Sequence, residues 1–414
     1  MVRGGTAVLS LLVALLLPSA AAAQWTQQAL DHQYDLAADL PLRNTPWVGT
    51  HNSFNSPAEM GPALSAQDSN QKITLVEQLD LGVRSLELDV HWFFSPSEGG
   101  FAPVVCHATG QHAGCTVEKP LATVLDEIRG WSDRHPDQVI LLYLEDHLDS
   151  EEGYDAAARV VEEKLGDVLY RPSGTGCSEL PLELKRGGVE TAGKRFIAVS
   201  DCGLGSGWPS VVFDWSAHVE TRPRGYQDFP DCGPDFDRAT YERTIVRYFE
   251  DSTRLTNTGA GAGVTTRDDG IRPETAARMA RCGVDLTGLD QLVPGDARLD
   301  ALVWSWAPGE PSGGACALQR VDAGAPYGRF DARSCTEKHA AACRSATGTW
   351  TLSPKRVRAA DAAVACSAAG STHSVPRTGY EAQLLRVAME QARARTAWLA
   401  YRASGASWTP LDAR

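Results

Sequence analysis

The chain has 414 residues, of which 43% are hydrophobic and 22% are charged, and its formal net charge is −13. This length and composition predict a globular protein with room for one large domain and a small one. The negative charge argues against a nucleic-acid partner and against electrostatic adsorption to an anionic membrane, because both favour basic patches.

The first 23 residues differ in composition from the rest of the chain. Arg3 precedes an apolar run over residues 7–17, and small residues occupy positions 20–23. This order is typical of a secretory signal peptide, which we expect to be cut after Ala23. The apolar run is too short to anchor the chain in a bilayer. We therefore expect an exported, extracellular protein.

Ten cysteines fit an oxidising destination, because disulfides persist there and the number is even. Sequence alone does not fix their connectivity. The simplest pairing joins neighbours in chain order, which gives Cys106 with Cys115, Cys177 with Cys202, Cys232 with Cys282, Cys316 with Cys335, and Cys343 with Cys366.

Between Trp47 and Trp306 the chain alternates short apolar runs with helical stretches, which predicts a parallel α/β architecture. We expect strands over residues 47–50, 83–90, 103–107, 138–145, 195–200, 211–215, 284–289 and 301–306. Helices are expected over 121–131 and 154–169. Eight runs in this arrangement predict a (β/α)8 TIM-type barrel, with room for irregularity, as the domain spanning residues 24–310.

A Pro/Gly/Ser-rich stretch over residues 308–314 predicts a linker, after which residues 311–414 contain four cysteines. We expect this segment to form a small, β-rich domain held by disulfides. Its tryptophan and cysteine pattern over 304–343 is similar to the closing half of a C-type-lectin-like module, and that over 359–398 to an opening half. The usual calcium-binding sugar triplets are not evident.

Six polar residues lie at or near the C-terminal ends of the first four expected strands, where barrel enzymes place their chemistry. Side chains alternate along a strand, so Glu87 and Asp89 face one side and Leu86, Leu88 and Val90 face the other. By the same test Glu145 joins the interior set. The six residues are His51, Asn52, Glu87, Asp89, His107 and Glu145.

This set can cleave a phosphate diester, which requires neutralisation of the phosphoryl oxygens, a general base and a general acid. Asn52 and the three carboxylates offer oxygen ligands of the kind that Ca²⁺ or Mg²⁺ prefers over zinc. Three buried carboxylates would repel one another without a cation. The residues therefore predict a divalent metal site.

Four motifs carry a family resemblance. They are His51-Asn-Ser, Arg84-Ser-Leu-Glu-Leu-Asp89, Val104-Val-Cys-His107, and the run that ends in Leu-Tyr-Leu-Glu145-Asp-His147. In order and spacing, residues 47–170 resemble the X region of phosphatidylinositol-specific phospholipase C, particularly its calcium-dependent branch. The metal-independent bacterial members carry an arginine where this chain has Asp89.

The resemblance implies a role for each residue. His51 would stabilise the pentacoordinate phosphorus, His107 would be the general acid, and either Glu87 or Glu145 would be the general base. Asn52, Glu87, Asp89 and Glu145 would hold the metal, with Ca²⁺ expected rather than Mg²⁺. Attack by the inositol 2-hydroxyl would release diacylglycerol and a cyclic inositol phosphate.

Two basic residues are further candidates for substrate binding. Arg84 could contact the phosphate, although pairing with a neighbouring acid is an alternative. Lys194, at the start of the fifth expected strand, could meet additional headgroup phosphates, although a solvated strand start is an equally good interpretation. Of the later acidic residues, Asp251, Asp285 and Asp290 could orient a histidine.

The expected partner is a phosphatidylinositol-type headgroup, reached by a monomer in transient contact with a membrane surface. Residues 92–94, Trp-Phe-Phe, are expected in a loop at the rim of the site, where they could enter lipid or pack in the core. One alternative is a glycerophosphodiester phosphodiesterase acting on soluble diesters, which should begin with His-Arg-Gly rather than Gly-Thr-His51-Asn. Another is a non-catalytic protein that binds glycans through the C-terminal domain.

Overall fold

The structure of the protein is a computed structural model. It describes residues 17–412 except 62–67, 109–111, 113, 116, 175, 234–235, 253–254, 258–261, 265–269, 323–324 and 406. Within these residues, none of the helices combines the length and apolar character needed to cross a bilayer.

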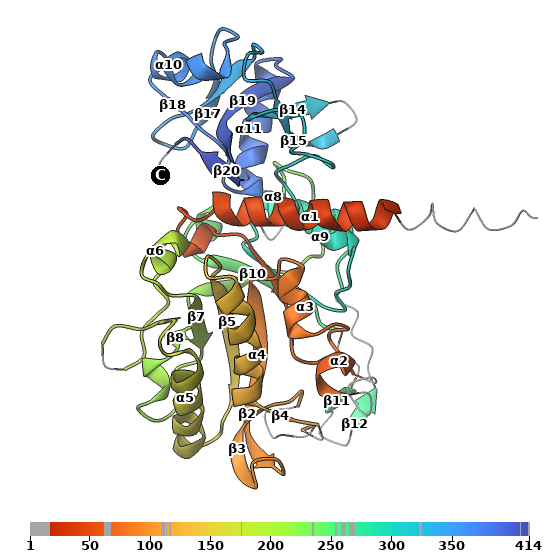
Figure 1. Ribbon diagram of the computed structural model, residues 1–414, viewed down its shortest axis with the longest axis vertical. Helices are drawn as coiled ribbons and strands as arrows, with labels where there is room; N and C mark the ends of the chain where they lie inside the picture. Colours follow the sequence, from red (N-terminus) through yellow and green to blue (C-terminus); the bar gives the residue numbers. More distant parts are fainter. Residues whose placement is uncertain are drawn as a thin grey trace, which may run out of the picture.

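The elements follow one another along the chain in an α/β order and then in a β-rich order (Figure 1). The helices are α1 (Leu17–Leu36), α2 (Pro57–Met60), α3 (Leu75–Asp80), α4 (Leu121–Arg134), α5 (Glu151–Leu165), α6 (Arg186–Thr191), α7 (Arg238–Tyr241), α8 (Pro273–Cys282), α9 (Ala297–Leu302), α10 (Ala362–Ser367) and α11 (Gly379–Gln391), with short 3-10 turns at Leu42–Asn44, Trp208–Ser210 and Ala359–Asp361. The strands of the first sheets are β1 (Trp47–Thr50), β2 (Ser85–Ser95), β3 (Gly100–Val105), β4 (Lys119–Pro120), β5 (Ile140–His147), β6 (Leu169–Tyr170), β7 (Phe196–Ser200), β8 (Phe213–Asp214), β9 (His218–Glu220), β10 (Ile245–Phe249), β11 (Leu255–Asn257), β12 (Ala262–Val264) and β13 (Leu286–Leu289). The remaining strands are β14 (Cys316–Asp322), β15 (Ala325–Arg333), β16 (Ala340–Arg344), β17 (Trp350–Leu352), β18 (Thr372–His373), β19 (Thr396–Ser404) and β20 (Ser407–Pro410).

The large sheet confirms the expected parallel α/β architecture. Its strands follow the order β6-β7-β5-β2-β1-β13-β10-β9, all parallel, and β8 also pairs with β7. Among the described strands the pairing path stays open between its two ends. The barrel is therefore a curled half-barrel with helices outside, the irregular form of the expected TIM-type fold.

The alternation of side chains along β2 and β5 is confirmed. The two strands pair in register, with Glu87 opposite Tyr143 and Asp89 opposite Glu145. Leu88 and Leu144 face the opposite side and pack in the main hydrophobic core with the outer helices α4 and α5. The carboxylates consequently line the inner face of the half-barrel.

Two of the expected runs, 103–107 and 301–306, are not parallel strands of the barrel. Residues 103–107 do not form a parallel barrel strand, because β3 runs antiparallel to β2 in a hairpin. Trp92, Phe93 and Phe94 therefore lie in β2 rather than in a loop. The second is the run over residues 301–306. Residues 301–302 end helix α9, whose N-cap Asp296 accepts a hydrogen bond from the Arg298 backbone N–H. The residues that follow lie outside the large parallel sheet.

Three strands of the parallel order were not expected from the sequence: the short edge strand β6, where the expected helix over 154–169 ends, and β9 and β10. β9 and β10 complete the sheet beyond β13, and β10 pairs with it at Arg247 opposite Leu286. The run Ile-Val-Arg-Tyr-Phe of β10 was not predicted as a strand because a charged residue stands at its centre. Arg247 and Phe249 both lie on the inner face with Ile245. The apolar-run criterion fails where an interior position carries a charge.

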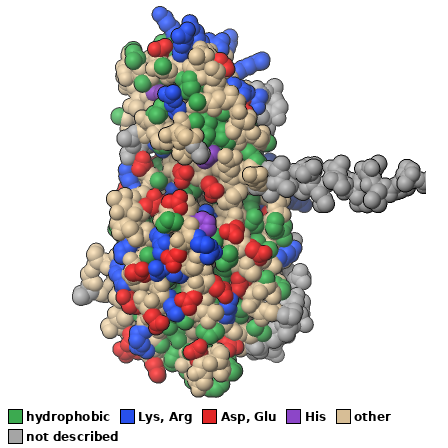
Figure 2. All heavy atoms as spheres, in the orientation of Figure 1, with side chains coloured by type: hydrophobic (Ala, Val, Ile, Leu, Met, Phe, Trp, Pro, Cys, Tyr) green, Lys and Arg blue, Asp and Glu red, His purple; other side chains and the backbone are tan. Residues whose placement is uncertain are grey.

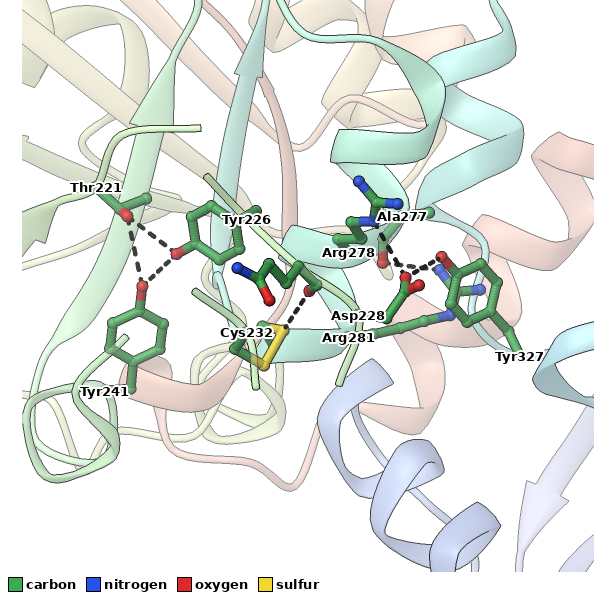
Figure 3. The surroundings of a disulfide bond; sticks show 11 residues. Thr221, Tyr226, Asp228, Cys232, Tyr241, Ala277, Arg278, Arg281 and Tyr327 are labelled. Atoms are coloured by element: carbon green, nitrogen blue, oxygen red, sulfur yellow. Dashed lines mark hydrogen bonds and ion pairs between the residues drawn. A yellow bond between two sulfur atoms is a disulfide. The ribbon is translucent and has the colours of Figure 1, made fainter. Parts of the chain in front are cut away.

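All five disulfides join the expected neighbours in chain order. Figure 3 shows the surroundings of Cys232–Cys282. Nearby, the Asp228 carboxylate pairs with Arg278 at 3.1 Å and accepts a hydrogen bond from the Tyr327 hydroxyl at 3.0 Å. Because Tyr327 belongs to β15, this cluster ties a barrel loop to the C-terminal region.

The C-terminal region is β-rich and contains two disulfides, as expected. Its sheet has the order β15-β14-β19-β16-β17, and α11 packs against α8 of the barrel. The start of α11 lies so close to α8 that a Cβ at Gly379 would meet the Ala280 carbonyl oxygen at 2.6 Å. Figure 1 places this region at the N-terminal end of the barrel strands, with α1 between them.

Helix α1 covers the same end of the barrel. The Gln33 amide oxygen accepts hydrogen bonds from the Trp304 and Ser305 backbone N–H groups at 2.6 and 3.0 Å. The expected cleavage position after Ala23 lies within the bounds of α1, and the processing itself stays a prediction. The residues after it are an integral part of the fold.

Candidate active site

His51 follows β1 and is paired with a carboxylate from the neighbouring strand. Its Nδ1 lies 3.2 Å from Asp290 Oδ1, directly after β13. Asp290 is buried and also accepts hydrogen bonds from the Asn70 amide at 3.2 Å and the Ser252 backbone N–H at 2.6 Å. The Gln71 amide also donates to Asp290, at 3.4 Å, so that three donors besides His51 fix the carboxylate that orients the imidazole.

The charge around His51 favours its protonated form. Burial would lower its pKa, but the negative charges of Glu87, Asp290 and Asp89 outweigh burial and raise the pKa to about 10. Before a metal binds, His51 is therefore a cation at neutral pH. Such a group suits charge stabilisation on a phosphoryl oxygen better than proton abstraction.

His107 follows β3 and forms the second histidine–carboxylate pair. Its Nδ1 lies 3.5 Å from Asp68 Oδ2, and the Asp68 side chain is buried. Burial is the largest influence and lowers the pKa of His107, His51 repels its protonated form, and Asp68 opposes both. The antiparallel hairpin, rather than a parallel strand, brings this histidine to the C-terminal end of the half-barrel.

Glu87 and Asp89 lie below the histidines on the inner face and are buried. Burial raises the pKa of Glu87 to about 7, with repulsion from Glu145 added and attraction to His51 opposing. The pKa of Asp89 is raised well above its ordinary value by burial and by Glu145 and Glu87. The positive charge of His51, with that of Arg247 in the case of Glu87, offsets these effects only in part.

Asn52 completes a group of converging oxygens. Its φ of 43° places it in the left-handed region that asparagine tolerates. In one orientation its amide donates hydrogen bonds to both Asp89 carboxylate oxygens, at 2.6 and 3.0 Å; in the other, its oxygen faces them. Amide and carboxylate oxygens at such separations fit the coordination of a hard cation.

Glu145 is opposite Asp89 in register, and its side chain contacts His147 two residues further along β5. Its Oε1 lies 3.4 Å from His147 Nε2. Burial would raise the pKa of Glu145, yet the hydrogen bond from His147 and the nearby positive charges lower it. Among the described residues no tight ligand group contains all three carboxylates. A shared cation would require Glu145 to turn back from His147.

Arg84 and Lys194 are not brought to this site. Arg84 directly precedes β2, donates hydrogen bonds to the Leu79 and Val83 carbonyl oxygens at 2.8 Å, and lies 4.7 Å from the Trp131 ring centroid. Lys194 precedes β7 and donates to the Asp167 carbonyl oxygen. Both residues stand at the N-terminal ends of parallel strands, whereas the histidines follow C-terminal ends, so neither can reach a substrate held by the histidines.

Arg247 is a site residue that sequence reasoning missed. From β10 its guanidinium lies within 5.2 to 5.6 Å of the ring centroids of Tyr143, Trp215 and Phe249. Its Nε and Nη1 are buried and make no hydrogen bond to any described residue. A cation with spare donors inside the half-barrel can receive hydroxyl or phosphate oxygens.

Phe249 forms the wall beside His51, with ring centroids 6.1 Å apart. Its own ring lies against Gly288 of β13, and a Cβ there would collide with the ring edge. Gly288 is required for close approach rather than for an unusual backbone conformation. The glycine sets where the aromatic wall stands.

Three other histidines gather beyond the carboxylates. His91 of β2 pairs in register with His147 at the end of β5, and its Nδ1 lies 2.9 Å from His112 Nδ1. His112 also pairs with Asp149 at 2.6 Å. Burial, then repulsion from His147 and His112, lowers the pKa of His91 to about 3. A neutral His91 packs here as a structural residue.

A large cavity lies elsewhere. A space of about 840 Å³ opens between the N-terminal ends of the strands and the C-terminal region, with Trp47, Arg84, Asp285 and Arg344 among its lining. The histidine–carboxylate pairs are at the other end of the barrel. We place the candidate active site by its chemistry and not by this cavity.

Comparison with known proteins finds a matching family model and several similar chains. A family model described as the Rv2075c PI-PLC-like domain matches residues 13–296. Uncharacterized protein Rv2075c of Mycobacterium tuberculosis is 41% identical over 376 residues, covering 86% of this chain and 75% of that protein. PI-PLC X domain-containing protein 1 of Arthroderma benhamiae is 30% identical over 197 residues, covering 46% and 57%. The solved phosphatidylinositol-specific phospholipase C of Listeria monocytogenes aligns with a TM-score of 0.45 at 14% identity, over 67% of this chain and 97% of that one.

Proposed function

The chain belongs to the family of the Rv2075c PI-PLC-like domain, and from this premise we propose that it is a phosphodiesterase that cleaves phosphatidylinositol-type lipids. The observation that carries the proposal is the pair of histidines, each held by a buried carboxylate, next to an inner face whose carboxylates are only partly compensated. These groups supply the acid, the base and the charge stabilisation that the reaction needs.

In the proposed reaction Glu87 or Glu145 takes the proton of the inositol 2-hydroxyl. The freed oxygen attacks phosphorus, and the bond from phosphorus to the glycerol oxygen breaks. His107 donates a proton to that oxygen, so that diacylglycerol and an inositol cyclic phosphate leave. A pKa of about 7 suits Glu87 to base catalysis near neutral pH.

His51 and His107 divide the remaining work. The positive charge of His51 would stabilise the pentacoordinate phosphorus. The lowered pKa of His107 means that the free enzyme holds it neutral. The anionic phosphate of a bound substrate would raise that pKa and let His107 carry the proton it donates.

A divalent cation fits the donor set of Asn52, Glu87, Asp89 and Glu145. Bound there, it would neutralise the phosphoryl oxygens and the carboxylates themselves. We propose Ca²⁺ in preference to Mg²⁺, because an amide and carboxylates from two strands give a flexible cage rather than a near-ideal octahedron.

Contact with the membrane surface is proposed for the β2–β3 hairpin. Phe94 and Phe101 are 50% and 62% exposed, and their rings lie 6.1 Å apart near its tip. Leu204, in the loop after β7, is a further exposed apolar residue at the C-terminal end of the strands. Figure 1 places the hairpin at the end of the molecule away from the C-terminal region. With five disulfides, an extracellular monomer acting at a lipid surface is the proposed form.

The test is an assay for inositol cyclic phosphate released from phosphatidylinositol vesicles by the full chain. Calcium should support activity, and a chelator or His51→Ala should abolish it. His135 caps the C-terminal end of helix α4, away from the site. His135→Ala is therefore the matched control and should retain activity. Activity that survives both chelator and His51→Ala would contradict the proposed chemistry.

A further inference from the structure

Charge is divided unevenly along the chain. Residues 311–414 contain 14 of the 39 Lys and Arg residues but only 7 of the 52 Asp and Glu residues. The C-terminal region therefore carries a formal charge of +7, while residues 1–310 carry −20. Figure 2 shows Lys and Arg side chains gathered over the end formed by the C-terminal region, and Asp and Glu side chains spread over the barrel.

Six exposed cations of this region stand on three adjacent segments, which we call the basic edge. An isolated bridge joins His339 to Val357, the Arg356 guanidinium donates to the Lys338 carbonyl oxygen at 3.0 Å, and β16 pairs with β19 just beyond residue 395. The residues of the basic edge are Lys338, Lys355, Arg356, Arg358, Arg393 and Arg395.

The charges of the basic edge are not neutralised within the described part of the chain. No ion pair joins any of the six side chains to a described carboxylate, and the nearby Glu337 is engaged by His339 at 3.1 Å. Asp361, exposed at the start of α10, is the other acidic residue on these segments. Six like charges held together at a cost in repulsion suit a polyanionic partner.

We propose that the basic edge binds an acidic polysaccharide, a glycan chain that bears sulfate or carboxylate groups. The run Lys355-Arg-Val-Arg358 and the flanking cations offer a row of donors to anionic groups that repeat along a polymer. Binding of this kind gains its free energy from release of counterions. The inference does not depend on the proposed catalytic function.

Position favours a polysaccharide over a membrane as the partner. The C-terminal region packs on the N-terminal end of the barrel, whereas Phe94 and Phe101 lie at the opposite end (Figure 1). A bilayer on the basic edge would hold the proposed active site away from its surface. A flexible polymer can occupy the edge while the other end of the molecule works.

Nucleic acid is a poorer fit to the same charges. Single-stranded nucleic acid is held by aromatic platforms on which bases stack. The described residues of this region expose no large aromatic side chain among their strongly exposed apolar ones, which are Val364 and Leu411. Five disulfides also indicate an oxidising compartment, where charged glycans are available.

The test measures binding of the full chain, without an affinity tag, to heparin as the sulfated polysaccharide at several salt concentrations. Dextran is the uncharged control ligand. The edge variant is Lys355→Glu with Arg356→Glu and Arg358→Glu, all exposed. The control variant is Arg134→Glu with Arg159→Glu and Arg222→Glu, exposed residues of the barrel domain with the same change in net charge.

We expect salt-sensitive binding to heparin and none to dextran. The edge variant should bind at least about tenfold more weakly, and its salt slope should fall by about 2 to 3, because each lost contact removes roughly 0.7 to 0.9 from the slope. The control variant should keep the slope. Unchanged thermal unfolding of both variants would show that the fold is retained.

Three results would overturn the proposal. The first is equal loss of heparin binding by the edge and control variants. The second is edge-dependent binding to phosphatidylserine vesicles or to single-stranded DNA without binding to heparin. The third is edge-dependent self-association in sedimentation, again without heparin binding, which would assign the edge to the acidic barrel of a second copy.

Discussion

The two ends of the half-barrel differ in how completely their buried charges are hydrogen-bonded or paired. At the N-terminal end, Arg84 is buried but donates to backbone carbonyl oxygens and to the Gln138 amide oxygen, and it also stacks on Trp131. At the C-terminal end, Glu87 and Asp89 are buried beside one another with their pKa values raised. The first arrangement is complete within the chain, whereas the second needs something from outside it. Buried charge points to a missing ligand where the chain compensates it only in part.

The largest effect expected from this contrast is loss of catalysis at the C-terminal end. His107→Ala should lower turnover of phosphatidylinositol by about 10² to 10⁴, the usual contribution of a general acid. Its thermal unfolding should change little, because the imidazole is partly exposed and makes one side-chain pair. Vesicle assays and calorimetry on the same preparation measure both quantities. Turnover that stays within a factor of two would remove His107 from the mechanism.

The matching change at the N-terminal end should reverse the pattern. Arg84→Ala should reduce the free energy of unfolding by about 2 to 4 kcal/mol, because it removes the donors to the Val83 carbonyl oxygen and the Gln138 amide oxygen and opens space beside Trp131. Turnover per folded molecule should be unaffected. Denaturant unfolding together with active-enzyme titration provides the measurement. Reduced turnover with normal stability would instead return Arg84 to substrate binding.

Metal removal should lower the stability of the protein by an amount that depends on pH, because the carboxylates at the C-terminal end titrate. Burial raises the folded pKa values of Glu87 and Asp89 above the unfolded 4.5 and 3.8. Folding therefore favours their protonated forms, and stability is lost as pH rises through the folded values. Near pH 8, Ca²⁺ at about 100 times its Kd should restore about 2.7 kcal/mol.

Near pH 5 the same addition should do much less, because protonated carboxylates bind the cation poorly. Thermal unfolding with calcium and with chelator at both pH values makes the comparison. Asp89→Asn should remove the calcium effect at the higher pH. A calcium effect of equal size at both pH values would argue against this cluster as the binding site.

The smallest effect concerns the rim of the C-terminal end. Phe94→Ser with Phe101→Ser should weaken binding to phosphatidylinositol vesicles by about tenfold or more, because each buried phenyl ring contributes about 1.5 to 3 kcal/mol in full and less at an interface. Cleavage of a soluble, short-chain substrate should not change. Vesicle sedimentation and the two assays test this. Equal losses on both substrates would indicate packing within the protein rather than lipid contact.

Sequence reasoning succeeded where a period or a local motif carried the information. Strand parity put Glu87, Asp89 and Glu145 on one face because the alternation of side chains is a property of any strand. It could not show that β3 returns antiparallel, since an apolar run has the same appearance in either direction. Neither could it show where Glu145 would turn its side chain.

The partners of the two histidines depend on the fold as a whole. Asp290 is 239 residues from His51 along the chain, and it meets His51 only because β1 pairs with β13. Asp68 lies in the connection before α3 and reaches His107 only through the hairpin. The prediction for Arg84 was wrong for a related reason. The motif that Arg84 shares with Asp89 runs along the strand, so the two residues lie toward opposite ends of the barrel.

Gly288 gives the substrate space an adjustable width. Phe249 can stand beside His51 only while position 288 has no side chain. A single methyl group there would push the ring toward the reacting groups and leave each of them chemically intact. Position 288 therefore controls the space left for the headgroup of the proposed substrate. Gly288→Ala should favour smaller headgroups while the proposed catalytic residues stay unchanged.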